Sequence, residues 1–236
     1  MLAGIPTRIG YRRKHGFLLT QALPDTKGEG KKSEAFYNED LLSGLSIPGP
    51  GSTDLYFPLS ATRSPAFDSL KKPFVVLNVS ASCRSKSWPL QNFSVLAGLL
   101  FDKLHFASVL IGKEADCEVV KNRTSSPVTS FAETLPLREL GALLKQATLH
   151  ISNDTGPMHI AAAVHTPVIA IFGRTRPGLG PARWAPLGKD HTVLQKKIGC
   201  DPCLAHDCQL DFDCLKATKV EDVFHAVQTY TARLVC

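Results

Sequence analysis

The sequence predicts an α/β protein built on a Rossmann-like parallel sheet, and two observations support that prediction. From Lys72 onward, short apolar runs alternate at least four times with segments that repeat apolar residues at helical spacing. This alternation is typical of parallel strands joined by crossover helices. The run at 74–79 is continuously apolar, as expected of a strand buried on both faces of a sheet.

The expected elements follow one another in chain order. Strands are expected at residues 74–79, 107–111, 128–131, 148–152 and 167–172, and helices at 89–101, 114–121, 137–147, 155–164 and 221–234. The first helix opens with Pro89, which suits a first helical turn, and continues with Leu90, Phe93 and Leu96 on one face. A long loop rich in Gly, Pro and Arg follows Phe172.

Residues 1–72 form a different kind of segment. They offer short strands at 7–11 and 17–20, a helix at 35–45, and then a linker rich in Gly, Pro and Ser at 46–65. Such pieces are too few to close a core. We therefore expect 1–72 to be the tail of something larger or a wrap on the next domain, and 73–236 to be the main domain.

Composition excludes several classes of protein. With 44% hydrophobic and 20% charged residues, the chain is not collagen-like, disordered or coiled-coil. The longest apolar stretch, 161–172, is too short to span a membrane, and the first seventeen residues lack the apolar run of a signal peptide. These features predict a cytoplasmic protein. The net charge of +6 suits an anionic small molecule or surface and is too scattered to predict nucleic-acid binding.

The sharpest motif is Ser-Asn-Asp-Thr-Gly-Pro-Met-His at 152–159, where an expected strand ends and a helix begins. Thr155 and Gly156 would present backbone N–H groups without helical partners, and the positive end of the helix dipole would favour an anion there. His159 lies one turn further on the same helix face. The alternative is an ordinary capped helix with a satisfied histidine.

A second motif, at 78–89, also follows a buried strand and precedes a helix. Ser80 and Ser82 offer hydroxyls, while Arg84 and Lys86 offer cations suited to a phosphate. The alternative is a solvated polar loop.

Two weaker signals come after other strands. Glu114, in Gly112-Lys-Glu114, could bind ribose hydroxyls, although a glutamate there is usually a helix N-terminal charge. The loop at 173–181 lacks the spacing of known phosphate loops, and a surface loop is slightly favoured for its Arg174, Thr175 and Arg176.

Four cysteines, Cys200, Cys203, Cys208 and Cys214, form a C-x₂-C-x₄-C-x₅-C cluster. This spacing is compatible with a structural zinc site, with His206 as a spare ligand. Reduced buried cysteines or a disulfide are the alternatives. No metal is expected at the transfer site.

The motif at 152–159, followed by Ala161-Ala-Ala and the strand to Gly173, resembles the signature of the ADP-heptose:lipopolysaccharide heptosyltransferases, glycosyltransferase family nine. Lys86-Ser-Trp-Pro89 is similar to that family's K-x-W-P segment. The cysteine cluster and the opening 3–11 resemble the heptosyltransferase II branch.

The resemblance implies a two-domain GT-B fold with the active site in its cleft. It implies inverting, metal-independent transfer of heptose from ADP-L-glycero-β-D-manno-heptose to the lipopolysaccharide inner core, without a cofactor. The acceptor would be membrane-anchored and phosphorylated, so the basic excess suits peripheral docking at the anionic cytoplasmic face of the inner membrane.

The resemblance also assigns residue roles. Lys86 would neutralise charge on the leaving ADP, and Asp154 would share the catalytic centre with it. The remaining donor contacts would come from Ser80, Ser82, Glu114, Thr155, Gly156 and His159. Asn78-Val-Ser-Ala stands where the family more usually has an H-P-G-A type sequence, which is a departure in the phosphate loop.

By this resemblance the chain would begin well inside the amino-terminal domain. Residues 1–72 would be a remnant of that acceptor domain, and the general base would lie in the missing part. Two alternatives remain open: a fragment that binds ADP without transfer, and a family member that uses another nucleotide sugar.

Overall fold

The computed structural model describes residues 4–49, 54–59, 65–133 and 135–235. The chain divides into two compact units. The first comprises residues 1–53 and 175–185, and the second comprises 54–174 and 186–236. Among the described residues, no helix is long and apolar enough to cross a membrane.

The first unit contains a two-stranded parallel sheet and two helices. Strands β1 (Ile9–Tyr11) and β2 (Gln21–Leu23) pair with each other, and the helices are α1 (Glu34–Ser43) and α6 (Pro181–Trp184). The expected strand at 7–11 and helix at 35–45 are confirmed. The strand expected at 17–20 is wrong, because Gly16–Leu18 form a 3-10 turn closed by the Leu18 N–H on the His15 carbonyl, and the strand begins only at Gln21.

Ion pairs hold this first unit together. The Lys27 ammonium pairs with Glu34 at 2.5 Å and lies 4.7 Å from the centre of the Tyr11 ring. Arg183, on α6, reaches the other oxygen of Glu34 at 2.7 Å. The Glu34 carboxylate therefore joins segments that lie far apart in the sequence.

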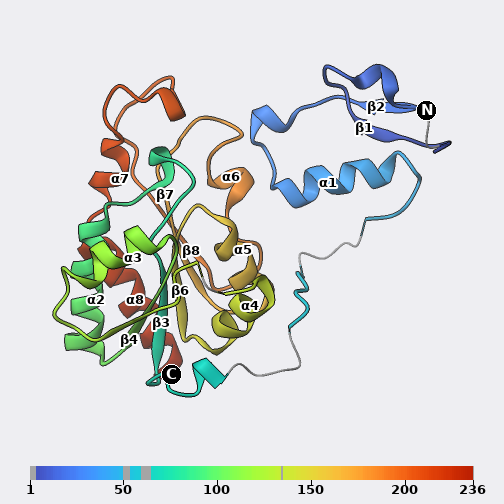
Figure 1. Cartoon of the computed structure of the whole chain (residues 1–236). Helices are drawn as coiled ribbons and strands as arrows, with labels where there is room; N and C mark the ends of the chain where they lie inside the picture. The colour runs from blue at the N-terminus through green and yellow to red at the C-terminus, as the bar shows by residue number, and fades with distance from the viewer. Residues whose placement is uncertain (1–3, 50–53, 60–64, 134, 236) are drawn as a thin grey trace. The chain divides into compact units, whose positions relative to one another are not determined.

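The second unit is a six-stranded, fully parallel sheet (Figure 1). Its strands are β3 (Phe74–Asn78), β4 (Ala107–Ile111), β5 (Val128–Ser130), β6 (Leu149–Asn153), β7 (Val168–Phe172) and β8 (Thr192–Gln195). They lie in the order β5-β4-β3-β6-β7-β8. The predicted parallel sheet is confirmed, and β8 is an additional strand that was not predicted.

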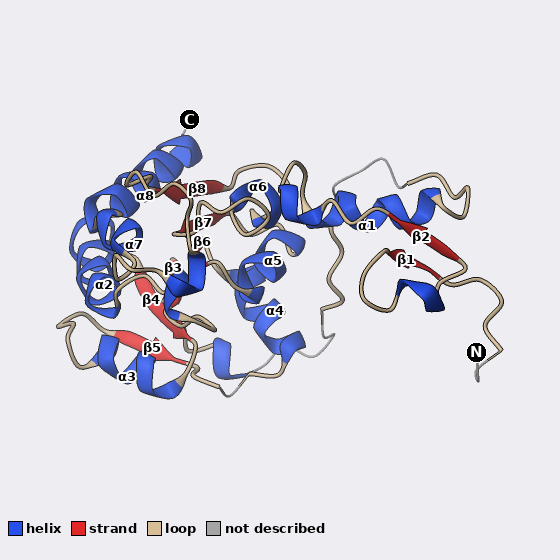
Figure 2. Cartoon of the chain, turned by 90° about the horizontal axis from the view of Figure 1, so that it is seen from above, coloured by secondary structure: helices blue, strands red, loops and turns tan. Residues whose placement is uncertain are grey.

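Helices cover both faces of this sheet. Figure 2 shows α2 (Leu90–Leu104) and α8 (Val220–Val235) on one side of the strands, and α4 (Leu137–Gln146) and α5 (Gly156–Ala163) on the other. Helix α3 (Glu114–Lys121) packs beside α2, and the short α7 (Asp213–Ala217) precedes α8. The five predicted helices of this unit are confirmed to within three residues at each end, and α7 was not predicted.

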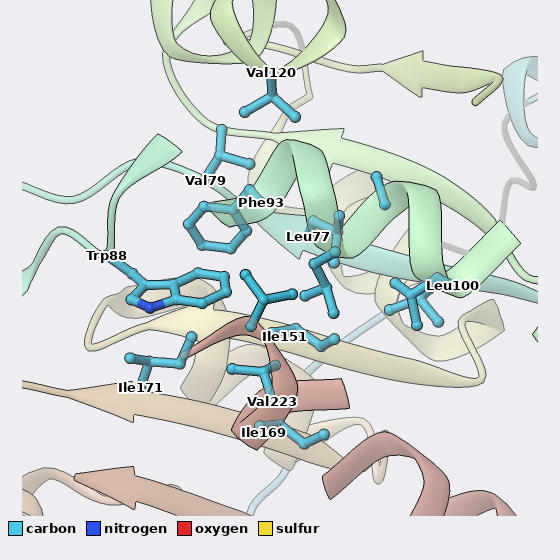
Figure 3. Packing of buried hydrophobic residues seen from close by; sticks show 14 of the residues in the cluster. Leu77, Val79, Trp88, Phe93, Leu100, Val120, Ile151, Ile169, Ile171 and Val223 are labelled. Atoms are coloured by element: carbon cyan, nitrogen blue, oxygen red, sulfur yellow. The ribbon is translucent and has the colours of Figure 1, made fainter. Parts of the chain in front are cut away.

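Trp88 occupies a central place in the core between the sheet, α2 and α8 (Figure 3). Its ring meets Phe93 edge-on, with ring centres 4.8 Å apart. Its indole N–H donates to the Thr218 carbonyl at 2.8 Å, so this buried polar group is satisfied. The residue that ends the β3–α2 loop is thus fixed by the core.

His150 is a fully buried histidine on β6. Its Nδ1–H donates to the Val76 carbonyl of β3 at 3.1 Å, and its Nε2 has no hydrogen-bond partner among the described residues. Burial lowers the pKa of this imidazole to about 4. The ring is therefore neutral in the folded protein at neutral pH.

His150 should make the free energy of unfolding depend on pH. The unfolded ring protonates near its ordinary pKa of 6.5, whereas the folded ring stays neutral down to about 4. Between these values the unfolded state binds more protons, so stability falls as the pH falls through this interval. The loss should reach about 3 kcal/mol by pH 4, since one pKa unit corresponds to about 1.36 kcal/mol.

Urea unfolding at pH 4 to 7.5 checks this expectation. His150→Leu should flatten the pH dependence, while His225→Gln, at an exposed position on α8, should keep it. An identical pH slope in His150→Leu and the wild-type protein would contradict the account.

Candidate functional site

A cavity of about 370 Å³ lies at the carboxyl edge of the large sheet. The strand order reverses there, because β4 lies on one side of β3 and β6 on the other. Open parallel sheets bind ligands at such a switch point. The lining residues follow β3, β4, β5 and β6: Asn78, Ser80, Ala81, Ser82, Lys86, Gly112, Lys113, Glu133, Asp154, Thr155, Gly156 and Pro157.

Asn153, the last residue of β6, holds the loop that follows β3. Its side-chain N–H groups lie 3.3 Å from the carbonyl oxygens of Asn78, Val79 and Ser80. Its Oδ1 accepts the backbone N–H of Trp88 at 2.9 Å. One buried amide therefore fixes both ends of the loop that carries Lys86.

The amino terminus of α5 forms the opposite wall. Thr155 is the residue before the helix, and its hydroxyl accepts a hydrogen bond from the Asn78 side chain at 2.5 Å. Gly156 opens the helix and has free space where a side chain would be. The first N–H groups of a helix lack internal partners and carry the positive end of its dipole. This wall is therefore suited to an anion.

Three charged side chains meet behind this wall. The Asp154 Oδ2 lies 2.5 Å from Arg174 Nη2 and 3.3 Å from the Lys86 ammonium. The side chains of Asp154 and Arg174 are only 5% and 6% exposed, whereas that of Lys86 is 21% exposed. Two cations on one carboxylate leave a net positive charge, and of these two cations Lys86 is the one that lines the cavity.

His159 lies one helical turn into α5, outside the cavity lining. Burial lowers the pKa of its imidazole, Lys86 lowers it further, and Asp154 opposes both. At neutral pH the ring is therefore neutral and can act as a hydrogen-bonding group beside the charged cluster.

Ser80 is part of the cavity wall and is itself fixed by two hydrogen bonds. Its hydroxyl donates to Asp116 at 2.6 Å and accepts the Lys113 N–H at 2.8 Å. Gly112 packs against it with a φ of 140°, and a Cβ there would lie 2.9 Å from the Ser80 Cβ. Only glycine suits this approach.

The structure brings most of the predicted site residues into one cavity: Ser80, Ser82, Lys86, Asp154, Thr155 and Gly156. Glu114 does not line it, because it is the exposed first residue of α3, and Glu133 after β5 supplies the further carboxylate. His159 lies next to the cluster.

The sequence analysis did not assign Asn153, Glu133 or Arg174 to the site. It favoured a surface loop for Arg174. A signal for Arg174 did exist. It follows β7 as Asp154 follows β6, and neighbouring parallel strands end at the same edge.

The cysteines at 200, 203, 208 and 214 form no disulfide in the described structure. Burial raises the pKa of the Cys214 thiol, and the other three cysteines add to that shift. No group of three or more His, Cys, Asp or Glu residues among those described is arranged to hold a metal ion. The disulfide that the spacing allowed is therefore not formed among the described residues, and the structural zinc site stays a prediction.

The fold and site define an α/β protein with a cavity at the switch point of a parallel sheet, lined by Lys86 and the amino terminus of α5. The family model described as glycosyltransferase family 9 (heptosyltransferase) matches residues 45–212. The chain belongs to this family.

Curated relatives agree with the family match. Lipopolysaccharide heptosyltransferase 3 of Escherichia coli K12 is 35% identical over 149 residues, which cover 56% of this chain and 43% of the relative. Lipooligosaccharide heptosyltransferase 2 of Haemophilus ducreyi is 23% identical over 215 residues, covering 82% of this chain and 60% of the relative. The chain thus spans less than two thirds of the length of these relatives.

Solved structures show the same fold. A glycosyl transferase family 9 protein from Veillonella parvula superposes with a TM-score of 0.78 at 18% identity, covering 98% of this chain and 69% of that one. The E. coli ADP-heptose lps heptosyltransferase II gives a TM-score of 0.75 at 20% identity, covering 99% and 72%. The expected relation to GT-B glycosyltransferases is confirmed at the level of the fold.

Two cavity glycines should respond differently to alanine. Gly112→Ala should cost about 1–3 kcal/mol of stability, because the new Cβ crowds Ser80 at a φ that side chains rarely adopt. Gly156→Ala should change stability by less than about 0.5 kcal/mol, because its Cβ meets open space. Urea unfolding of both variants checks this, and equal costs would contradict the described wall.

Proposed function

We propose that the second unit binds the diphosphate of a nucleotide-sugar donor, and that this donor is an ADP-heptose. One observation carries the proposal: Lys86 and the open amino terminus of α5 face the same cavity at the sheet's switch point. A lysine and unpartnered backbone N–H groups together form a recurrent phosphate-binding arrangement.

The comparisons support the choice of ADP-heptose. One E. coli heptosyltransferase with the same fold was solved with ADP, and again with ADP-2-deoxy-2-fluoro heptose. The curated relatives act, by their names, on lipopolysaccharide or lipooligosaccharide. By analogy, the acceptor of the whole protein would be a hydroxyl of the lipopolysaccharide inner core.

The residues suggest how the transfer would proceed. The bond between the sugar's anomeric carbon and the diphosphate oxygen breaks as the acceptor oxygen attacks from the opposite face, which inverts the anomeric carbon. Negative charge then develops on ADP, where the Lys86 ammonium and the Thr155 and Gly156 N–H groups would stabilise it. Ser80 and Ser82 would border the phosphates.

The sugar side of the donor would lie near Asp154 and the neutral His159. The acceptor hydroxyl must lose a proton to a base, which we place outside the second unit. We further propose that 73–236 form the donor-binding domain and that 1–72 belong to the acceptor-binding part. If the acceptor is membrane-anchored and phosphorylated, the protein would act at the cytoplasmic face of the inner membrane. Its net charge of +6 suits docking at that anionic surface.

Isothermal titration calorimetry with ADP should detect weak binding, with a Kd on the order of 0.1–1 mM. Lys86→Ala should weaken it by more than tenfold, because a charge-assisted contact contributes about 1.5–3 kcal/mol. Lys121→Ala, on an exposed stretch of α3, should leave the Kd unchanged. An unchanged Kd in Lys86→Ala would overturn the phosphate role of this lysine.

Titrations with UDP and GDP under the same conditions test the donor assignment. ADP should bind at least several-fold more tightly than either. A clear preference for another nucleotide would indicate a different donor. Binding of ADP without transfer of heptose by the whole protein would indicate a binding module.

Removal of divalent ions should not affect ADP binding. The diphosphate charge would be met by Lys86 and backbone N–H groups, so the Kd in EDTA should equal the Kd in Mg²⁺ within about twofold. A large loss of affinity in EDTA, with the circular dichroism spectrum unchanged, would contradict this assignment.

A further inference from the structure

Arg174 is a buried cation close to the cavity that does not line it. Its side chain is 6% exposed, while its partner Asp154 does line the cavity. A buried arginine needs a carboxylate and a defined geometry to offset its desolvation. Arg174 has both a carboxylate partner and a defined geometry.

The position of Arg174 is fixed from two directions. Its guanidinium bonds Asp154 Oδ2 at 2.5 Å, and its carbonyl accepts the Gln195 side-chain N–H at 2.7 Å. Gln195 is the last residue of β8. The ends of β6, β7 and β8 are thereby tied together behind the cavity.

Lys86 shares the same carboxylate oxygen at the longer distance of 3.3 Å. If Asp154 had only Lys86 as a partner, the two charges would cancel. The other two charged residues of the lining, Lys113 and Glu133, also offset each other in formal charge, so the cavity would have little net charge to offer a diphosphate. With Arg174 present, the three groups sum to one positive charge. Lys86 and Asp154 line the cavity, whereas Arg174 does not.

We propose that Arg174 is a positioning residue that neutralises Asp154 and so leaves the charge of Lys86 available to the ligand's diphosphate. This inference rests on the proposed function, since it concerns the same anion site. Arg174 acts here through Asp154 and Lys86 rather than by touching the ligand.

The test is a set of ADP titrations on folded variants of this chain. Arg174→Gln should weaken ADP binding by about tenfold, because Asp154 would then neutralise Lys86. Arg174→Lys should stay within about threefold of the wild-type Kd, because the charge is kept. Arg123→Gln removes the same charge at an exposed position and should leave the Kd unchanged.

A rescue variant separates this electrostatic role from a structural one. The double variant Asp154→Asn, Arg174→Gln removes one negative and one positive charge, so the cluster keeps the single positive charge of Lys86. The Kd of this variant for ADP should return to within about threefold of the wild-type value. ADP lacks the sugar, so a role of Asp154 toward heptose does not enter this measurement. The double variant buries no unpaired charge, so it keeps the proposal testable if Arg174→Gln alone fails to fold.

An unchanged Kd in Arg174→Gln would overturn the inference. So would a tenfold weaker Kd in the folded double variant, since Arg174 would then contact the ligand or act structurally. Absence of ADP binding by the folded wild-type chain would instead overturn the proposed function.

Discussion

The hydrogen bonds of Asn153 join the ends of β3 and β6, and the candidate site depends on this junction. The two N–H groups of one buried amide are shared among three carbonyls at the end of β3 and the start of the β3–α2 loop, and its oxygen accepts the Trp88 N–H. Trp88 is in turn packed against Phe93 and bonded to Thr218. The loop that carries Lys86 is therefore held by the core, and its ammonium meets Asp154, the next residue after Asn153.

The topology explains why a cavity forms at this place. Strands β3 and β6 are adjacent in the sheet although three crossover connections separate them in the chain. Their loops diverge to opposite sides and open a cavity between them. The charged cluster then determines what the cavity can hold, because two cations share one carboxylate. Family membership is consistent with a diphosphate ligand at this edge.

Sequence patterns predicted the second unit well because its four central strands, β3, β4, β6 and β7, are buried on both faces. The bounds of β4 and α3 were predicted to the residue, and β3, β6 and β7 to within one residue at either end. Strand β8 was not predicted because it is a short, half-exposed edge strand without a continuous apolar run. The motif at 152–159 identified Asp154, Thr155 and Gly156, since one local segment contains them. Arg174 and Glu133 follow other strands of the chain, and the pairing of these strands in the sheet brings the two residues to the site. Local residue spacing therefore does not predict their place.

The most direct test of the central claim is a heteronuclear NMR titration of the backbone N–H signals with ADP. We expect the largest shifts at the ends of β3, β4 and β6, with Gly112, Thr155 and Gly156 among them. A second, larger cavity of about 600 Å³ lies between β8 and α8, away from these strand ends. Shifts confined to that cavity, or none at saturating ADP, would contradict the assignment of the diphosphate site.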